Sequence, residues 1–302
     1  MSSLFSSSSN SARSRLVYGK DDSLFGSIEE RQGDKPFGKV LDAGTGMHSL
    51  RWIATLEDKG MTEFTAITAD VTMQRNVQTE AEALRVLHLG RVIIGNWFGN
   101  NPLDEQLLFQ NTDQEPPYDT ILADYLIGAM DGFSPYQQDL MIPKLAKLLK
   151  PGGRLYIVGL EPIPDTAPGD ANIICKIRQV RDACILIAGH RCYREYPMEW
   201  IERQIQTQAD DTLFLLRATP FPILYRHATI VNQINVARSK FSYFPNPELA
   251  NQMKAVLDDL EEQSLRATTD RGRIRLGFDY VVMAEKKNSR AIGANESMDR
   301  AG

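Results

Sequence analysis

Short apolar runs alternate with amphipathic segments along the first half of this chain. The apolar runs, rich in β-branched residues and bounded by Gly, Asp or Asn, occupy 38–41, 64–68, 91–95, 120–123 and 155–158. Segments with apolar residues at helical spacing lie between most of them, at 47–58, 78–87 and 136–149. The alternation predicts an α/β fold with a parallel sheet and helices on both faces, in which ligands bind beyond the carboxyl ends of the strands.

The second half of the chain continues with helical patterns and two further apolar runs. We expect helices at 172–188 and 198–208 and strands at 212–217 and 273–285. The segment between these two strands, about 219–270, is far longer than a hairpin and contains helical patterns at 228–240 and 247–266. This helical insertion is expected to form a lid or a dimer contact.

Both ends of the chain are polar. Residues 1–14 contain eight serines and no acid, and Arg13 and Arg15 stand at the end of this stretch. This composition predicts a disordered tail over 1–22, and it is also compatible with an organelle transit peptide. A second disordered tail is predicted at 288–302, which leaves 23–287 as one α/β domain.

Composition excludes several classes of protein. The formal net charge of −5 and the pI near 5.5 argue against a nucleic acid partner, and no apolar run reaches the length of a membrane span. The three cysteines, Cys175, Cys184 and Cys192, form no C-x-x-C pair. We therefore expect neither a disulfide framework nor a bound metal, and a cytoplasmic location.

A glycine-rich loop follows the first predicted strand. Residues 40–46 read Val-Leu-Asp-Ala-Gly-Thr-Gly and lead into a helical pattern. Gly44 and Gly46 have no Cβ, so the chain can turn sharply and a ligand can approach the backbone N–H groups around Thr45. This arrangement is typical of cofactor-binding loops, although a tight turn alone would have the same residues.

Polar and aromatic residues follow the next two strands. An acid in the position of Asp70 can accept both hydrogen bonds of a ribose diol, or it can cap the helix that follows. Asn96 could bond the edge of an adenine while Val71 or Trp97 lies on the ring face. For Trp97 the alternative is a place in the core.

These motifs resemble the class I S-adenosylmethionine-dependent methyltransferases over 37–161. The resemblance rests on the glycine loop, on Asp70, and on Leu-Leu-Lys-Pro-Gly-Gly-Arg-Leu-Tyr-Ile-Val at 148–158. It implies a doubly wound, Rossmann-like sheet of seven strands whose last strand is antiparallel. It also implies the cofactor S-adenosyl-L-methionine, with Asp42, Gly44, Thr45 and Gly46 at the methionine end, Asp70 at the ribose, and Val71, Asn96 and Trp97 around the adenine.

Two positions depart from the family pattern. His48 stands where a third glycine is frequent, and Asn96 stands where an aspartate is frequent. The missing glycine also argues against a nicotinamide dinucleotide, whose fingerprint needs it. In addition, Asp42 would repel a pyrophosphate, whereas it suits the ammonium and sulfonium groups of S-adenosylmethionine.

Methyl transfer asks mainly that the acceptor be held in line with the methyl carbon and that water be excluded. The resemblance implies that Asp124 and Tyr125 lie nearest the transferred methyl group and that Glu161 closes the other side. Asp124 would contact both cofactor and acceptor. The structural alternatives are packing for Tyr125 and a turn cap for Glu161.

The acceptor is expected to be a small molecule. His190 and Tyr193 lie in a polar and aromatic cluster at 190–197 and are candidate substrate residues, although a histidine at a helix end is commonly a dipole partner. Base-methylating relatives carry Asn/Asp-Pro-Pro-Tyr/Phe after the fourth strand, whereas this chain has Asp-Tyr-Leu-Ile at 124–127. Five arginines are expected on the solvated surface or around a substrate carboxylate: Arg178, Arg181, Arg191, Arg194 and Arg203.

The sequence therefore predicts an enzyme that transfers a methyl group to a nitrogen, oxygen or sulfur of a small metabolite. The insertion at 219–270 could make the protein a homodimer. The alternative function is a non-catalytic scaffold that keeps the methyltransferase fold and binds a partner protein through this insertion.

Overall fold

The computed structural model describes residues 23–98, 103, 108, 116–208 and 212–288. The tail predicted at 1–22, and with it the transit peptide, lies outside the described residues, as does the tail predicted at 288–302 except for Asn288. The chain divides into two compact units. Unit 1 contains the described residues up to 159 together with 198–219 and 280–288, and unit 2 contains 160–197 and 220–279.

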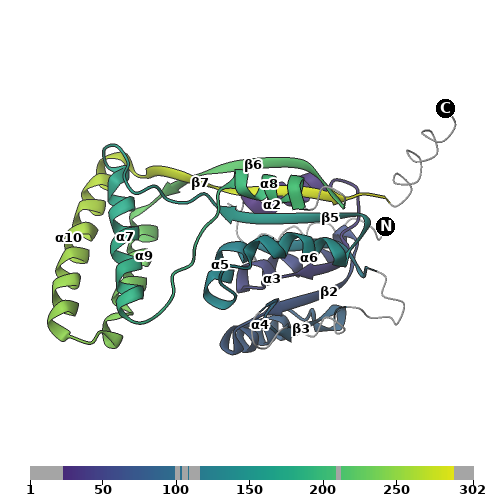
Figure 1. The fold of residues 1–302 in the computed structure, drawn as a ribbon, viewed down its shortest axis with the longest axis horizontal. Coiled ribbons are helices and arrows are strands. Elements are labelled where there is room, and N and C mark those ends of the chain that lie inside the picture. Colours follow the sequence, from purple (N-terminus) through teal and green to yellow (C-terminus); the bar gives the residue numbers. More distant parts are fainter. Residues whose placement is uncertain (1–22, 99–102, 104–107, 109–115, 209–211, 289–302) are drawn as a thin grey trace, which may run out of the picture. The chain divides into compact units, whose positions relative to one another are not determined.

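Seven strands form one sheet (Figure 1). In chain order they are β1 (Gly38–Asp42), β2 (Met61–Thr68), β3 (Gly90–Ile94), β4 (Tyr118–Asp124), β5 (Leu149–Leu160), β6 (Leu213–Tyr225) and β7 (Ile274–Lys286). Their order in the sheet is β3-β2-β1-β4-β5-β7-β6. The first five strands pair in parallel and the last strand is antiparallel, which confirms the predicted doubly wound class.

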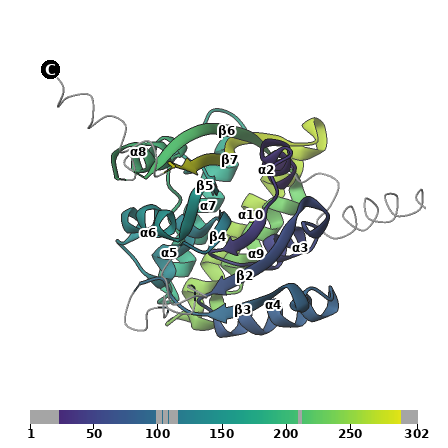
Figure 2. The ribbon, with the colours of Figure 1, turned by 90° about the vertical axis from the view of Figure 1, so that its right-hand side faces the viewer.

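Helices cover both faces of this sheet in unit 1 (Figure 2). One face carries α2 (Ser23–Gln32), α3 (Met47–Ile53) and α4 (Val71–Ala83), and the other carries α5 (Leu126–Phe133), α6 (Met141–Leu148) and α8 (Met198–Gln208). The buried ring of Phe25 in α2 stacks on Trp52 in α3, with ring centroids 4.6 Å apart. This pair fixes the first helix to the one that follows the glycine loop.

Two predicted helices are shorter than their patterns. The pattern at 47–58 gives α3 and a separate 3-10 turn at Glu57–Lys59, because the Thr55 hydroxyl donates to the Trp52 carbonyl at 2.7 Å and competes with the helical bonds. The pattern at 136–149 begins as a helix only at Met141, since Tyr136 has a left-handed φ of 66°. Other 3-10 turns occur at Leu87–Leu89, Gln138–Leu140 and Phe241–Tyr243.

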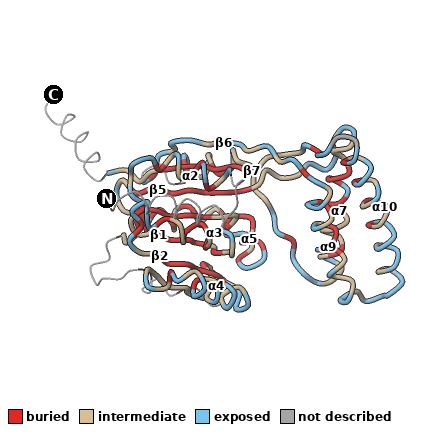
Figure 3. Tube along the Cα trace, turned by 180° about the vertical axis from the view of Figure 1, so that it is seen from behind, coloured by how far each residue is buried: buried red, intermediate tan, exposed pale blue. Residues whose placement is uncertain are grey.

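Unit 2 is built around three helices. They are α7 (Ala171–Ile187), α9 (His227–Arg238) and α10 (Pro247–Arg271), and each contacts the other two. Figure 3 shows buried faces along α7 and α9, which contribute Ile174, Ile177, Ile230 and Ile234 to a common apolar core. The insertion expected at 219–270 supplies α9 and α10, but α7 comes from 160–197, so unit 2 is assembled from two separate segments of the chain.

Candidate functional site

The glycine loop lies at the carboxyl edge of the parallel strands. Its backbone is bonded to both neighbours of β1: the N–H of Ala43 donates to the Leu122 carbonyl of β4 at 2.9 Å, and the N–H of Thr45 donates to the Ile67 carbonyl of β2 at 2.7 Å. These two hydrogen bonds within the protein hold the first part of the loop against both neighbouring strands.

The two glycines of this loop serve different purposes. A Cβ on Gly44 would lie 2.9 Å from Cδ1 of Leu126, so a side chain there would push against α5. A Cβ on Gly46 would meet no atom within 4 Å. Gly46 is the N-cap of α3, and its N–H donates to the Ser49 hydroxyl at 3.1 Å. Packing therefore requires Gly44, whereas Gly46 borders open space.

Asp42, the last residue of β1, is fully buried. Among the residues that the structure describes, neither of its carboxylate oxygens has a donor in hydrogen-bonding geometry. Burial raises the pKa of Asp42 to about 6, although the nearby Ser49 and Thr45 hydroxyls and the Gly44 N–H favour its ionised form. The protein thus compensates this carboxylate only in part, and a buried acid in that state favours a positively charged ligand.

Asp70 and Val71 begin the helix that follows β2. Asp70 is the N-cap of α4, and its Oδ1 accepts a hydrogen bond from the Met73 N–H at 2.7 Å. The capping alternative is therefore present, and no described residue bonds the second oxygen of this exposed carboxylate. Val71 beside it leaves 51% of its surface exposed. The ribose role of Asp70 stays a prediction.

Asn96 and Trp97 are bound into the protein at the end of β3. The Asn96 amide donates to the Phe133 carbonyl at 2.8 Å and accepts from the Ser134 hydroxyl at 2.6 Å, which ties this strand end to the end of α5. Trp97 is only 4% exposed, and its indole N–H donates to the Ala43 carbonyl at 2.6 Å. This geometry matches the core alternative for Trp97.

Asp124 and Tyr125 lie where β4 passes into a strained turn. Asp124 ends the strand and is half-buried. Tyr125 has a left-handed φ of 48°, and its N–H donates to the Val158 carbonyl of β5 at 3.0 Å. A non-glycine residue in this conformation costs about 1–3 kcal/mol, and such residues cluster at functional sites. The turn places Asp124 at the same sheet edge as Asp42 of the adjacent strand.

Solved structures match this chain at low sequence identity. A candidate methyltransferase from Bacillus halodurans C-125 is 12% identical, with a TM-score of 0.52 over 88% of this chain and 99% of the other. The YcgJ protein of Bacillus subtilis is 13% identical, with a TM-score of 0.51 over 88% and 98% of the two chains. The [4+2]-cyclase SpnF is 14% identical, with a TM-score of 0.50 over 91% and 81%. No protein-family model and no curated protein matches.

Strand order and these matches together decide the fold. This chain has the class I methyltransferase fold. The strand order of this fold reverses beside β1, between β1 and β4, which is where ligands bind in doubly wound sheets. Asp42, the glycine loop and Asp124 lie at that switch point.

Several neighbours of the site were not among the predicted residues. Ser49 contacts Gly46 and lies near Asp42, and its spacing of three residues from a helix start is a signal that the sequence offers. Lys144 of α6 donates to the Trp97 carbonyl at 3.0 Å and lies 4.5 Å from the centre of the Phe98 ring. No local pattern predicts Lys144, because its position depends on packing against the loop after β3.

The remaining predicted residues belong to unit 2. The N–H of Glu161 donates to the Phe278 carbonyl at 3.0 Å. The exposed ring of His190 contacts Tyr243 with centroids 4.9 Å apart, and Tyr193 is 58% exposed. All of these contacts are made within unit 2, so the catalytic role of Glu161 and the substrate roles of His190 and Tyr193 stay predictions.

Three further features of the described residues concern metal binding, membrane-spanning helices and disulfides. Within the described ranges, no group of three or more His, Cys, Asp and Glu residues could hold a metal ion. No helix in that part of the chain has the length and apolarity needed to cross a bilayer. Cys175, Cys184 and Cys192 are all buried free thiols.

Proposed function

We propose that this protein transfers a methyl group from S-adenosylmethionine to a small-molecule acceptor. The observation that carries the proposal is Asp42, a buried and incompletely compensated carboxylate at the switch point of a methyltransferase fold. A cationic group would supply the positive charge that this carboxylate lacks. The pyrophosphate of a dinucleotide would instead be repelled by it.

Other residues of the strand edge also fit this cofactor. Gly46 borders open space at the start of α3, and Thr45 beside it holds the loop in place. The second carboxylate oxygen of Asp70 can accept from a ribose diol, and Val71 offers an exposed apolar surface to a purine ring. Asn96 has one amide hydrogen and one lone pair left for an adenine edge.

When bound, S-adenosylmethionine supplies a methyl group that is already activated on a sulfonium. We assign to Asp42 the positively charged end of the cofactor and to Asp70 its ribose. Asp124 and Tyr125 would hold the acceptor atom in line with the methyl carbon, about 3–3.5 Å away. For a hydroxyl or ammonium acceptor the Asp124 carboxylate would take the proton, whereas a thioether needs no base.

Charge and local sequence support a small acceptor. The net charge of −5 disfavours a polyanion, and Tyr125, Leu126 and Ile127 stand where base-methylating relatives carry two prolines followed by an aromatic residue. Three buried, free cysteines support a cytoplasmic location. The homodimer expected from the insertion remains a prediction.

The alternatives come from the fold itself. The [4+2]-cyclase SpnF shares this fold, so the fold does not by itself entail methyl transfer. A non-catalytic scaffold that binds a partner protein through 219–270 is the second alternative. Both alternatives differ from the proposal in a measurable way, because neither consumes S-adenosylmethionine.

Calorimetric titration of the full chain with S-adenosylmethionine and, separately, with NAD tests the proposal. We expect micromolar binding of S-adenosylmethionine and none of NAD. Asp70→Ala should weaken binding by about 1–3 kcal/mol, while Asp70→Ser keeps the N-cap and so separates loss of the ribose contact from loss of the cap. Absence of S-adenosylmethionine binding by the folded wild-type protein would rule the proposal out.

Turnover separates the enzyme from the scaffold. Amines, alcohols and thioethers are offered as acceptors, and formation of S-adenosylhomocysteine is measured. Asp124→Asn should lower turnover much more than cofactor affinity. Equal losses of turnover and of cofactor affinity would indicate that Asp124 contacts the cofactor rather than the acceptor.

A further inference from the structure

Unit 2 contains a cavity of about 220 Å³ that the proposed function does not use. It lies among α7, α9, the end of β6 and the loops on either side of α7. One part of its lining is aliphatic and comes from Ile163, Ile174, Ile177 and Ile230. The other part is polar and comes from Arg178, Arg181, Glu195, Tyr225 and Gln233. Every lining residue belongs to unit 2, so the cavity does not depend on unit 1.

The two arginines in this lining are already paired. Arg178 binds the Asp165 carboxylate at 2.8 Å and lies 3.6 Å from the Asp182 carboxylate. Arg181 binds Asp182 at 2.8 Å and donates to the Gln233 side chain at 2.5 Å. Two aspartates therefore neutralise the two guanidinium groups, and the arginines do not make the cavity a site for anions.

Glu195 differs from these paired groups. It forms neither an ion pair nor a hydrogen bond with any residue in the described part of the chain. Burial raises the pKa of Glu195 to about 7, Asp279 of β7 raises it further, and Arg181 of α7 opposes the rise. A half-buried carboxylate that no described residue bonds gains from a ligand that brings a positive charge and hydrogen-bond donors.

We propose that this cavity binds a small protonated amine with an apolar body, the ammonium group on Glu195 and the body against the four isoleucines. A cavity of 150 Å³ holds a benzene ring, so 220 Å³ suits an amine of about ten non-hydrogen atoms. The mixture of an aliphatic wall and a few convergent polar groups is typical of small-molecule sites.

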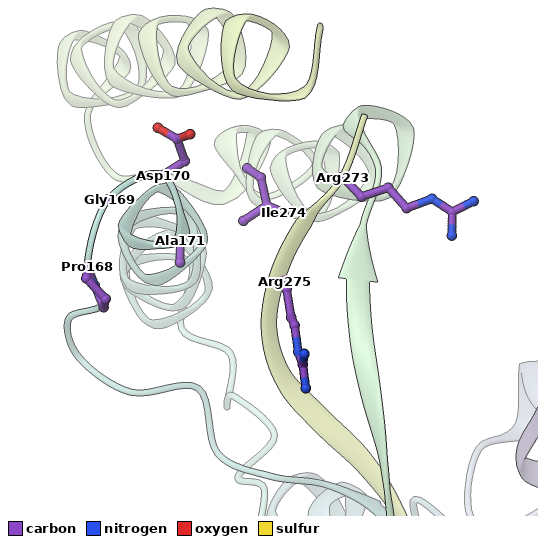
Figure 4. Close-up of a pocket in the computed structure, with 7 residues that line it drawn as sticks. All are labelled: Pro168, Gly169, Asp170, Ala171, Arg273, Ile274 and Arg275. Carbon is purple, nitrogen blue, oxygen red and sulfur yellow. The ribbon is translucent and has the colours of Figure 1, made fainter. Parts of the chain in front are cut away.

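A second cavity of unit 2 serves as a contrast (Figure 4). It has about 300 Å³ and lies at the start of α7, between 168–171 and 273–275. Arg273 and Arg275 are exposed, and their guanidinium groups point away from Asp170. The polar groups of this second cavity do not converge on a common point, unlike those of the cavity beside Glu195.

The test is calorimetry on the full chain at pH 8 with three matched probes: 2-phenylethylamine, 2-phenylethanol and phenylacetate. We expect saturable binding of the amine and at least tenfold weaker binding of the alcohol and of the anion. Glu195→Gln should weaken amine binding at least tenfold. Asp259→Asn removes an exposed carboxylate from α10 of the same unit and should leave binding unchanged.

A second variant guards against misfolding of Glu195→Gln. Ile163 is only half-buried, so Ile163→Trp should fold and fill the apolar part of the cavity, which we expect to abolish amine binding. Thermal melts check that both variants are folded. Equal affinity of wild type and Glu195→Gln, equal affinity for amine and alcohol, or no amine binding at all would each overturn the proposal.

The pH dependence of binding provides an independent readout. Amine affinity should fall as the pH drops below about 7, because Glu195 then becomes protonated while the amine keeps its charge. Affinity that is flat from pH 8 to pH 5.5 would contradict the assignment to Glu195. S-adenosylmethionine binding, measured on the same samples, reports on unit 1, so failure of either proposal is seen separately.

Discussion

Replacement of Asp42 by asparagine tests whether burial of the Asp42 carboxylate lowers the free energy of unfolding. The folded state buries this carboxylate without a geometrically satisfactory donor and raises its pKa from 3.8 to about 6. A carboxyl group with a raised folded-state pKa binds its proton more tightly in the folded than in the unfolded state. Its ionisation therefore lowers the free energy of unfolding progressively between about pH 4 and pH 6. The whole decrease persists at higher pH.

The size of this cost follows from the pKa shift. A shift from 3.8 to about 6 is roughly two units, and each unit corresponds to about 1.4 kcal/mol. Ionised Asp42 should thus lower the free energy of unfolding by about 3 kcal/mol at pH 8. Asparagine has nearly the same shape and no charge, so Asp42→Asn should be more stable than wild type by up to about that amount at pH 8.

The assay is urea denaturation of wild type and variant at several pH values from 4.5 to 8.5. The stability difference should grow between pH 4.5 and pH 6.5 and then remain constant. Glu57→Gln is the matched control, because Glu57 is exposed in the same unit, and its effect should stay within about 0.5 kcal/mol at every pH. Calorimetry should show that the stabilised Asp42→Asn variant binds S-adenosylmethionine at least tenfold more weakly.

Two results would refute this reasoning. A stability difference that does not change with pH would show that Asp42 is not ionised at a cost in the folded state. A variant that is more stable at pH 8 but binds the cofactor as well as wild type would show that the buried charge has no part in binding.

Three further predictions concern the same loop and its supports. Gly44→Ala should lower stability by about 1–3 kcal/mol because its Cβ would press on α5, whereas Gly46→Ala should fold normally and lose cofactor affinity in calorimetry. Trp97→Phe should cost about 1–3 kcal/mol in urea denaturation, since the Ala43 carbonyl loses its donor. Asn96→Asp should destabilise the protein by a similar amount at pH 7 and by less at pH 4, because an ionised aspartate cannot donate to the Phe133 carbonyl.

The sheet could be predicted because its signals are local. The runs at 38–41, 64–68, 91–95, 120–123 and 155–158 each fall within or overlap a strand, since short runs rich in β-branched residues and bounded by Gly, Asp or Asn favour strands. Alternation predicts a parallel sheet with helices on both faces, whereas the seven strands and the antiparallel last strand come from the resemblance to the class I methyltransferases. The positions of Asp42, Asp70 and Asp124 at strand or helix ends follow as well.

The organisation of unit 2 could not be predicted in the same way. The helical pattern at 172–188 is correct for α7, but a helical period does not say which core a helix joins. In this protein α7 packs with α9 and α10, and α8 packs against α6 of unit 1. That choice depends on contacts between segments far apart in the sequence, for which a single chain offers no local signal.

The same limit applies to individual side chains at the site. A tryptophan after a strand suggests that its ring stacks on an adenine. In the structure, however, Trp97 is buried and its indole N–H donates to the carbonyl of Ala43 in the glycine loop. The Asn96 amide likewise donates to the Phe133 carbonyl and accepts from the Ser134 hydroxyl, which leaves one N–H and one lone pair for a ligand. Replacing either residue would therefore alter cofactor binding through the shape of the loop even without a direct contact. For this reason Gly46, which borders open space, and Asp42, whose charge the protein compensates only in part, test ligand binding more directly than Trp97, whose indole N–H is already bonded.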